Sequence, residues 1–332
     1  GFIGSAFTRL VLRETSDYRV INFDALTYAG NPENLIELED NPRHTFIHGD
    51  ITHREAVLNS LPAGCEAIFN FAAESHVDRS IHSADEFLKT NISGVQVLLD
   101  AAREKNVRRF VQISTDEVMG SLPEEDETAF FTENSPLRPN SPYAASKASA
   151  ELVCRAARET FGTDTVVTRC GNNYGPRQFP EKLIPLMISN ALLDEPLPVY
   201  GDGRNVRDWI FVEDHCRAIW AIYERGKAGE VYNVGARSER RNLEVVEAIL
   251  DALGKPRSLI KFVADRLGHD RRYAIDPRKV ETEIGWRPRT NWEDGLRRTI
   301  EWYLDNQDWV SRVRDGKYRD FYQSIYGESL KG

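Results

Sequence analysis

The amino-acid sequence predicts an α/β fold in which a doubly wound parallel sheet precedes a smaller C-terminal α/β domain. Short apolar runs recur through the first half of the chain, and each is followed by polar residues. Segments with helical periodicity separate these runs, as expected when helices join parallel strands. The chain also opens with GFIGS, a Gly-x-x-Gly spacing that leads into an amphipathic helix and is typical of a nucleotide-binding turn.

The predicted strands of the first half are five apolar runs, at residues 18–24, 44–50, 67–75, 108–117 and 165–170. Two longer segments, 84–105 and 143–160, carry the period of a helix. A repeated order of strand, helix and strand implies that the strands run parallel and that helices cover both faces of the sheet.

After about residue 175 the pattern changes, because prolines and glycines cluster there. We predict a dinucleotide-binding domain over 1–175 and a second domain over 176–332, with parts of 205–240 as candidates for a return to the first. The acidic segment 123–140 is either a wall or lid of the site or a plain solvated loop, with about equal weight. Helices are predicted in the second half near 212–225, 242–253 and 292–305.

Composition and charge exclude several classes of protein. The chain holds 43 basic and 52 acidic residues, and its net charge of −9 is the opposite of what nucleic-acid binding requires. No apolar run approaches the length of a membrane span, so no membrane partner is expected. The seven histidines form no HxH or HExxH arrangement, so no metal is expected. The four cysteines lack paired or metal-like spacing, which favours a reducing cytoplasm over a disulfide framework or a zinc site.

The opening glycines predict a pyrophosphate site. Gly1 and Gly4 precede a helix whose first N–H groups could hold a pyrophosphate. Asp24 ends the next predicted strand, where a carboxylate binds the adenosine ribose and repels the extra phosphate of NADP. NAD is therefore the expected cofactor, although a turn or capping role for Asp24 has about equal weight on this residue alone. Three further residues lie at the same carboxyl edge of the predicted sheet: Asp50, Ala72 and Ala73.

Tyr143 and Lys147 lie four residues apart on a predicted helix and therefore share one face. A phenol titrates near pH ~10, so an ammonium nearby, beside a positively charged nicotinamide, would bring it into range for a general base. The spacing also occurs in YERGK (223–227), at a helix end with no strand-end hydroxyl to join it. Tyr143 differs because STDE ends a predicted strand and offers Ser114 or Thr115 to the same proton network.

Asp116 and Glu117 are two adjacent carboxyls at the ligand edge of the predicted sheet. They could be solvated charges. Beside a tyrosine–lysine pair, however, they could divide acid and base work, with one kept protonated by burial and by its neighbour while the other stays ionised. We favour this second interpretation.

The order of eight motifs resembles that of the nucleotide-sugar 4,6-dehydratases of the extended short-chain dehydrogenase/reductase superfamily, most closely those that act on dTDP-glucose. The motifs are GFIGS, FAAESHVDRS, STDEV, YAASKA, NNYGPRQFPEKLIP, VYGDGRNVRDWI, VEDH and GHDRRYAID. The resemblance covers essentially the whole chain. It implies a Rossmann-type first domain with NAD, and a C-terminal domain that binds the nucleotide sugar.

The resemblance also implies a redox-neutral elimination and a role for each catalytic residue. Tyr143 would take the proton of the sugar 4-hydroxyl while NAD accepts the C4 hydride, and Thr115 would position that hydroxyl. Glu117 would remove the C5 proton, and protonated Asp116 would give its proton to the departing 6-hydroxyl. The hydride then returns to C6 and leaves a 4-keto-6-deoxy sugar. Lys147 would hold the nicotinamide ribose and tune Tyr143.

Two sets of binding residues follow from the same resemblance. The residues expected to contact NAD or line its cleft are Gly1, Phe2, Ile3, Gly4, Asp24, Ala25, Leu26, Thr27, Asp50, Ile51, Ala72, Ala73, Glu74, Thr90, Tyr143, Lys147 and Asn173. The residues expected at the nucleotide-sugar site are Ser75, Asn172, Lys182, Leu183, Pro198, Tyr200, Arg207, Asn242, Arg266 and His269. The two arginines of this second set are forked donors suited to a diphosphate, although each alone would read as a surface ion pair.

Two positions depart from the family pattern. STDEV is followed by Met119 where the family usually has tyrosine, which is expected to alter the pocket wall beside the acid and base. DRLGHD carries Leu267 where proline is usual, which is expected to loosen the loop that brings Arg266 and His269 to the phosphates. Neither departure breaks the implied mechanism.

Two other functions stay open at this point. A nucleotide-sugar 4-epimerase or decarboxylase of the same superfamily shares the NAD site and the tyrosine–lysine pair but typically lacks the adjacent Asp–Glu. A regulator that binds NAD without chemistry would not need the five catalytic residues that are present here. By resemblance we also expect a homodimer formed through 84–105 and 143–160.

The glycines of GFIGS match the second and third of a T-G-x-x-G-x-x-G turn. The first glycine and the strand that feeds it are then expected just upstream of Gly1. We therefore expect the printed sequence to begin about ten residues late.

Overall fold

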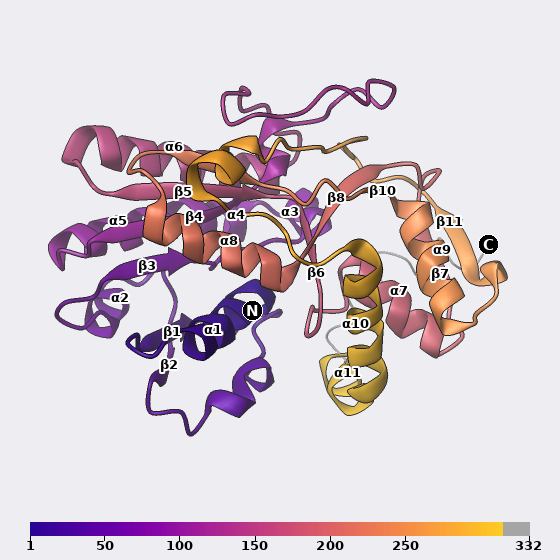
Figure 1. The fold of residues 1–332 in the computed structure, drawn as a ribbon, viewed down its shortest axis with the longest axis horizontal. Coiled ribbons are helices and arrows are strands. Elements are labelled where there is room, and N and C mark those ends of the chain that lie inside the picture. The colour runs from indigo at the N-terminus through magenta and orange to yellow at the C-terminus, as the bar shows by residue number, and fades with distance from the viewer. Residues whose placement is uncertain (315–332) are drawn as a thin grey trace.

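The computed structural model describes residues 1–314, and these form an α/β protein with parallel sheets (Figure 1). Each of the five predicted strands is confirmed in position. They are β1 (Val20–Asp24), β2 (His44–His48), β3 (Ala67–Asn70), β4 (Arg109–Thr115) and β5 (Thr165–Cys170). The further strands of the described residues are β6 (Asn172–Tyr174), β7 (Leu197–Tyr200), β8 (Val206–Phe211), β9 (Val231–Val234), β10 (Glu239–Arg241) and β11 (Ile260–Val263).

The predicted helices also form, with one difference. Residues 84–105 are not one α-helix, because a π-helical turn (Lys89–Gly94) separates α4 from α5. The α-helices are α1 (Phe2–Glu14), α2 (Arg54–Ser60), α3 (Val77–His82), α4 (Asp85–Leu88), α5 (Val95–Glu104), α6 (Pro142–Phe161), α7 (Leu183–Leu192), α8 (Val212–Arg225), α9 (Asn242–Leu253), α10 (Trp292–Asp305) and α11 (Gln307–Val313).

Strands β1 to β5, together with β9 from the second half of the chain, form two parallel sheets rather than the single sheet that the sequence predicts. One has the order β3-β4-β5-β9, and the other pairs β1 with β2. They stay separate because no strand of residues 1–314 pairs with both β1 and β3. The strand expected upstream of Gly1 stays a prediction.

Helices cover both faces of the four-stranded sheet, as a doubly wound fold requires. On one face α2, α5 and α6 bury Val57, Leu99 and Cys154 against the strands. On the other face α1 and α8 bury Leu10 and Ile219. The sheet therefore lies between two apolar layers.

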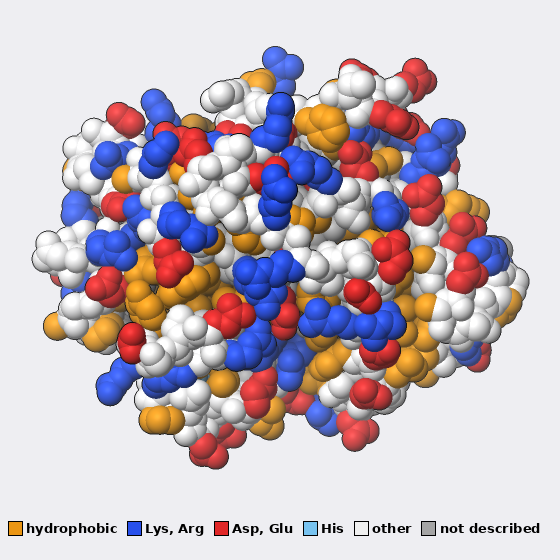
Figure 2. All heavy atoms as spheres, viewed as in Figure 1, with side chains coloured by type: hydrophobic (Ala, Val, Ile, Leu, Met, Phe, Trp, Pro, Cys, Tyr) orange, Lys and Arg blue, Asp and Glu red, His pale blue; other side chains and the backbone are white. Residues whose placement is uncertain are grey.

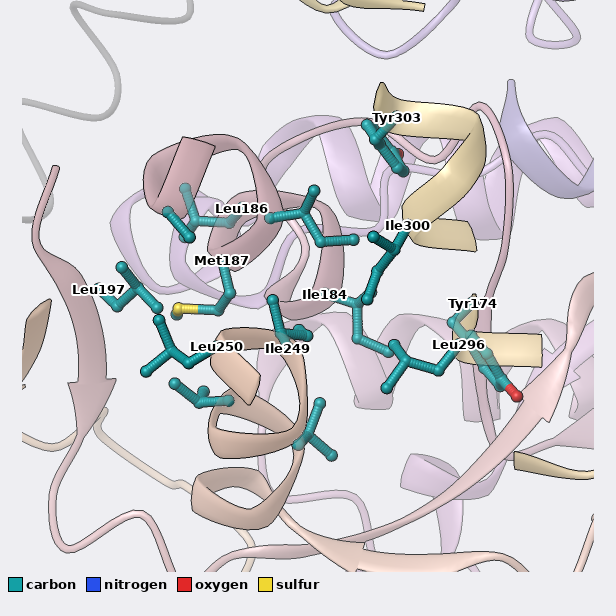
Figure 3. Close-up of a cluster of buried hydrophobic side chains, with 14 of the residues drawn as sticks. Tyr174, Ile184, Leu186, Met187, Leu197, Ile249, Leu250, Leu296, Ile300 and Tyr303 are labelled. Atoms are coloured by element: carbon teal, nitrogen blue, oxygen red, sulfur yellow. The ribbon is translucent and has the colours of Figure 1, made fainter. Parts of the chain in front are cut away.

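The C-terminal part has its own core. The mixed sheet β10-β8-β6 and the parallel pair β11-β7 surround it together with α7, α9, α10 and α11. Figure 3 shows Ile184 and Met187 of α7 beside Ile249 of α9 and Ile300 of α10. Between these elements, α8 and β9 run back to the first sheet, where β9 pairs with β5. The division into 1–175 and 176–332 stays a prediction, and its last residues, 315–332, lie outside the described part.

Helix α6 is closed at both ends by local chemistry. Ser141 accepts a hydrogen bond from the backbone N–H of Ala144, and Pro142 occupies the first turn, where its missing N–H costs nothing. Gly162 ends the helix at φ 72°, in the left-handed region that favours glycine. These caps fix where the first two turns of α6 stand.

The surface carries charges of both signs. On the face drawn in Figure 2, Lys and Arg side chains lie among Asp and Glu side chains, so the net charge of −9 is not gathered on this face. Residues 1–314 contain no helix long and apolar enough to cross a membrane, and no group of three His, Cys, Asp or Glu side chains that could hold one metal ion.

We expect Gly295→Ala to destabilise the protein, although alanine normally stabilises a helix interior. A Cβ at this position of α10 would overlap the hydroxyl of Tyr174, which is 1% exposed on β6. Overpacking of this kind typically costs ~1–3 kcal/mol of unfolding free energy, which urea denaturation would measure. Tyr174→Phe in the same chain should recover part of the loss. A Gly295→Ala variant as stable as the parent would contradict this packing.

Candidate active site

The predicted acid and base lie at the carboxyl end of β4, a strand buried along its whole length. Thr115 ends β4, and its hydroxyl caps the short 3-10 helix Asp116–Met119 by accepting from the N–H of Glu117 at 3.3 Å. The same hydroxyl donates to Asp116 Oδ1 at 3.2 Å. Asp116 is 1% exposed, and its Oδ2 has no hydrogen-bond partner within residues 1–314. The turn thus buries one carboxyl while the next, Glu117, lines a cavity.

The pKa values of the two carboxyls are shifted in the same direction. Burial, and then the neighbouring Glu117, raise the pKa of Asp116 well above the ordinary value of an aspartate. Burial also raises the pKa of Glu117, against the pull of Arg207, Lys182 and Arg266. Asp116 is the more buried of the two, and its Oδ2 has no hydrogen-bond partner within residues 1–314, so we expect it to be the carboxyl that keeps its proton, as a general acid needs.

Tyr143 and Lys147 are both buried in the first two turns of α6. The Lys147 ammonium donates to the carbonyl of Ile113 at 2.6 Å, and burial lowers its pKa to about 8. Burial and the Glu117 carboxylate raise the pKa of Tyr143 well above its ordinary value, and a hydrogen bond with Thr115 acts in the opposite direction. The lowering expected from Lys147 alone is therefore outweighed in the protein, because the phenol is desolvated and two carboxyls are close by.

A buried ion pair fastens α6 to the sheet beside these groups. Glu151, one turn beyond Lys147, accepts from Arg169 of β5 at 2.7 Å and from the Ser114 hydroxyl of β4 at 2.6 Å. Both side chains of the pair are 5% exposed. Ser114, which the sequence offered as an alternative to Thr115, thus serves this support instead of facing Tyr143.

All ten residues predicted for the nucleotide sugar line one cavity together with Glu117. The space between its walls is about 1040 Å³, part of which is open to solvent. The ten residues come from parts of the chain far apart in sequence, from the loop after β3 to the loop after β11. The cavity brings together Ser75, Asn172, Lys182, Leu183, Pro198, Tyr200, Arg207, Asn242, Arg266 and His269.

Positive charge in this cavity is held in place by neighbours. Arg207 donates to the carbonyl of Asp270 at 2.9 Å, and its guanidinium lies 4.3 Å from the ring centre of Tyr273. Lys182 donates to the carbonyl of Ser75 at 2.8 Å. Such fixed donors supply the local positive charge that the acidic chain otherwise lacks.

Most of the predicted cofactor residues lie at the carboxyl ends of β1, β2 and β3 and at the start of α1. Asp24 accepts from the N–H of Leu26 through Oδ1, while its Oδ2 lies 3.0 Å from the backbone nitrogen of Gly1. The first turn of α1 contains no acidic residue. Asp50 accepts from the N–H of Thr52 at 2.8 Å. This set of amides and carboxylates fits the pyrophosphate and ribose of a dinucleotide.

The remaining predicted cofactor residues are placed less directly. The backbone of Glu74 pairs with the Asn91 side chain in both directions at 2.9 Å, and burial raises the pKa of Glu74. Asn173 accepts at 2.8 Å from buried His215, which the VEDH motif supplies. The others lie in the first turn of α1, in the loops after β1, β2 and β3, or in the π-helical turn: Phe2, Ile3, Gly4, Ala25, Thr27, Ile51, Ala72, Ala73 and Thr90.

The two departures from the family pattern lie outside the cavity wall. Met119 is 2% exposed and packs behind the cavity-lining Tyr273, and its sulfur accepts from Arg169 at 3.5 Å. The Leu267 side chain is 76% exposed and does not line the cavity. Any effect of either residue on the ligand is therefore indirect.

The acidic segment 123–140 fastens the second half of the chain and does not itself line the cavity. Phe131 bridges to Ile275, and Arg272 donates to the carbonyls of Asp126 and Ala129. Only the following residue, Ser141, reaches the cavity. The segment is thus neither of the alternatives that the sequence allowed but a brace for residues 271–276.

Several cavity residues were missed from the sequence. His76, Glu181, Asp270 and Tyr273 lie within the motifs FAAESHVDRS, FPEKLIP and GHDRRYAID, so the motifs themselves were the available signal. Trp209 also lines the cavity, from the motif that carries Arg207.

Comparisons with known proteins agree on one family. The family model for GDP-mannose 4,6 dehydratase matches residues 1–299. A dTDP-glucose 4,6-dehydratase of Xanthomonas campestris pv. campestris (strain ATCC 33913) is 51% identical over 339 residues, which cover 96% of this chain and 95% of that protein.

Solved structures extend the comparison. The dTDP-glucose 4,6-dehydratase of Streptomyces venezuelae, solved with NAD and dTDP bound, has a TM-score of 0.91 at 48% identity and covers 94% of this chain and 97% of that one. The UDP-glucose 4-epimerase of Thermotoga maritima, solved with UDP-glucose, has a TM-score of 0.84 at 29% identity and covers 92% of this chain and 97% of that one. The epimerase is therefore similar in fold but more distant in sequence.

Glu151→Ala should strongly destabilise the protein, because it leaves the Arg169 guanidinium buried without its carboxylate. Loss of one partner of a buried pair costs ~3–5 kcal/mol of unfolding free energy, which urea denaturation would measure. Glu301→Ala is the control, since its pair with Arg297 is more than half exposed on both sides and should be worth less than ~1 kcal/mol. Equal losses in the two variants would contradict the supporting role of Glu151.

Proposed function

Because the chain belongs to the family of dTDP-glucose and related nucleotide-sugar 4,6-dehydratases, we propose that it dehydrates dTDP-glucose to the 4-keto-6-deoxy sugar with NAD as cofactor. It is a hydro-lyase. The observation that carries this function is the adjacent pair Asp116 and Glu117, one buried and unpartnered at Oδ2, the other on the cavity wall. Inversion at C4 alone would need no such pair.

The cofactor site is built from the carboxyl edge of the sheet. The N–H groups at the start of α1 would hold the pyrophosphate, and Asp24, at the end of β1, would hold the adenosine ribose. When bound, NAD accepts the hydride of the sugar C4 and later returns it to C6, so the overall reaction is redox-neutral. Lys147, whose ammonium donates to the carbonyl of Ile113, would hold the nicotinamide ribose.

The first proton transfer is made by Tyr143. Its phenolate takes the proton of the sugar 4-hydroxyl, and Thr115 orients that hydroxyl. Because burial keeps the Tyr143 pKa high in the protein alone, the phenol is a poor base until a cation lies beside it. The positive charge of an oxidised nicotinamide would supply the stabilisation of the phenolate that Lys147 alone does not. Oxidation at C4 then acidifies the C5 proton.

The elimination is divided between the two carboxyls. Ionised Glu117 faces the cavity and takes the C5 proton, while Asp116 gives its proton to the departing 6-hydroxyl, which leaves as water. The C5–H and C6–O bonds break, and a C5–C6 double bond forms beside the C4 ketone. When hydride reaches C6, this double bond is lost and protonated Glu117, which exchanges its proton with solvent, gives a proton back to C5. The unpartnered Oδ2 of Asp116 is the atom that would carry this proton.

The nucleotide is bound on the other side of the cavity. The guanidinium groups of Arg207 and Arg266 meet the diphosphate, and the remaining residues of the predicted set surround the sugar and the nucleoside. The same electrostatic match would apply to UDP-sugars, so the choice of thymidine rests on the similarity to dTDP-glucose 4,6-dehydratases.

Incubation with dTDP-glucose should give a product that has lost one water by mass and carries solvent deuterium at C5. Glu117→Gln should stop exchange at C5 while a single turnover still reduces NAD, and Asp116→Asn should slow water loss more than C5 exchange. General acid–base groups contribute ~10²–10⁴-fold, so each affected step should slow by that order. UDP-glucose is the control for selection of the thymine nucleobase of the substrate. A product of unchanged mass would indicate an epimerase, and an unchanged sugar a non-catalytic NAD protein.

Two finer features belong to the same proposal. The chain acts in the cytoplasm, which agrees with four free cysteines, three of them buried. It forms a homodimer through α4, α5 and α6. Leu88 of α4, Leu152 of α6 and Phe161 at the end of α6 are 47%, 56% and 56% exposed on these adjoining helices. Large apolar side chains on one outer layer support a subunit contact there.

Leu152→Asp should convert a dimer to a monomer, because it places a charge in the proposed apolar contact. Light scattering after size exclusion would measure the mass. Leu193→Asp is the matched control, since Leu193 is 58% exposed in the C-terminal half. A parent protein of single-chain mass, or equal dissociation by both variants, would contradict the assigned interface.

A further inference from the structure

Asp78 lies behind the nucleotide-sugar cavity and is held by two residues that line it. It belongs to the short helix α3 of the first half and is 8% exposed. Arg266 donates to it through Nε and Nη2, each at 2.7 Å, across 188 residues of sequence. The Tyr200 hydroxyl donates to the same carboxylate at 3.4 Å. Neither the family resemblance nor the cavity wall singled out this residue.

Asp78 fixes the Arg266 guanidinium in two directions. The two hydrogen bonds to Asp78 hold one edge of the guanidinium. The Tyr200 ring lies against its face, with the ring centre 5.0 Å from the guanidinium carbon. Tyr200 is itself tied to Asp78. One carboxylate thus orients both a forked cation and an aromatic ring in the cavity. A guanidinium carries five N–H donors and Asp78 engages two of them, so this pair does not exhaust its capacity to donate.

The same contact joins the two halves of the chain. Tyr200 ends β7 and lies opposite Val263, the last residue of β11, in the parallel pair of strands. Arg266 follows three residues later. Asp78 therefore anchors this end of the small sheet to α3. This anchor matters more because Leu267 stands where the family usually has a proline that would stiffen the loop.

We propose that Asp78 is a positioning residue for nucleotide-diphosphate binding, which rests on the proposed function. It holds Arg266 in the orientation that meets the diphosphate, so that no freedom of the guanidinium is lost on binding. The pair persists with ligand present. If Arg266 left Asp78 for a phosphate, the buried carboxylate would lose a bidentate cation, which is costly.

Asp78→Asn tests this role, because the amide keeps an oxygen for the Tyr200 hydroxyl but loses the charge and one acceptor for Arg266. Titration calorimetry on the NAD-loaded protein should compare dTDP with thymidine, which lacks phosphates. The dissociation constant of dTDP should rise about tenfold or more, and that of thymidine should change less than about twofold. KM for dTDP-glucose should rise while kcat stays within about twofold.

Glu281→Gln is the matched control, because Glu281 also accepts two hydrogen bonds from an arginine, Arg237, with lengths of 2.7 and 3.0 Å. Neither of these two residues lines the cavity. This control should change neither ligand's affinity. Equal or tighter binding of dTDP by Asp78→Asn would overturn the inference, and so would equal losses of dTDP and thymidine.

Arg266→Lys provides a second route if Asp78→Asn does not fold. It keeps the charge but loses the fork, so it should show the same selective loss of dTDP affinity. Where Asp78→Asn does fold, the double variant should lose no more than Arg266→Lys alone. Independent, additive losses would overturn the inference. If the parent protein binds no dTDP, the proposed function itself fails; if the parent binds it and the variants match the parent, only the role of Asp78 fails.

Discussion

The site depends on one constraint: two adjacent carboxyls are buried at the end of a buried strand. Asp116 and Glu117 follow β4 without a break, and the Thr115 cap fixes the turn that separates their environments. Burial raises the pKa of both, and the Glu117 charge raises that of Asp116 further. Two equal carboxyls are thereby made unequal by a single 3-10 turn, which is what an elimination needs from its acid and its base.

Supports for this pair extend into the rest of the fold. The Glu151–Arg169 pair ties α6, with its tyrosine and lysine, to β4 and β5. The cofactor and sugar regions also share supports, because the Tyr28 hydroxyl of the loop after β1 donates to Glu181 on the cavity wall at 3.1 Å. Asp78 makes a comparable connection from α3 to Arg266. Charges that serve the ligand are thus held by neighbours from the opposite half of the chain.

The sequence predicted the parts of this structure that depend on local pattern. Apolar runs located β1 to β5, and motif order located ten residues that line one cavity although they are scattered from Ser75 to His269. What it missed depends on distant contacts or on desolvation. The pairing of Asp78 with Arg266 joins positions 188 residues apart, and nothing in either motif specifies it. The separation of β1-β2 from the larger sheet depends on strand pairing, and the π-helical turn within 84–105 does not change the apolar period enough to be seen. The raised pKa of Tyr143 follows from burial that spacing alone does not show.

The pH dependence of kcat/KM for dTDP-glucose tests the central claim most directly, since both carboxyls must be in opposite protonation states at once. The titration belongs to the coupled pair, so the profile reports two apparent pKa values. We predict a bell-shaped profile of kcat/KM against pH. Its acid limb should lie above the ordinary glutamate value of ~4.3, where Glu117 ionises, and activity should fall again at higher pH as Asp116 loses its proton. Glu117→Gln should remove the acid limb from the residual activity. A parent profile that stays flat through the acid range down to pH ~4, or an acid limb that survives Glu117→Gln unchanged, would contradict the division of acid and base between these two residues.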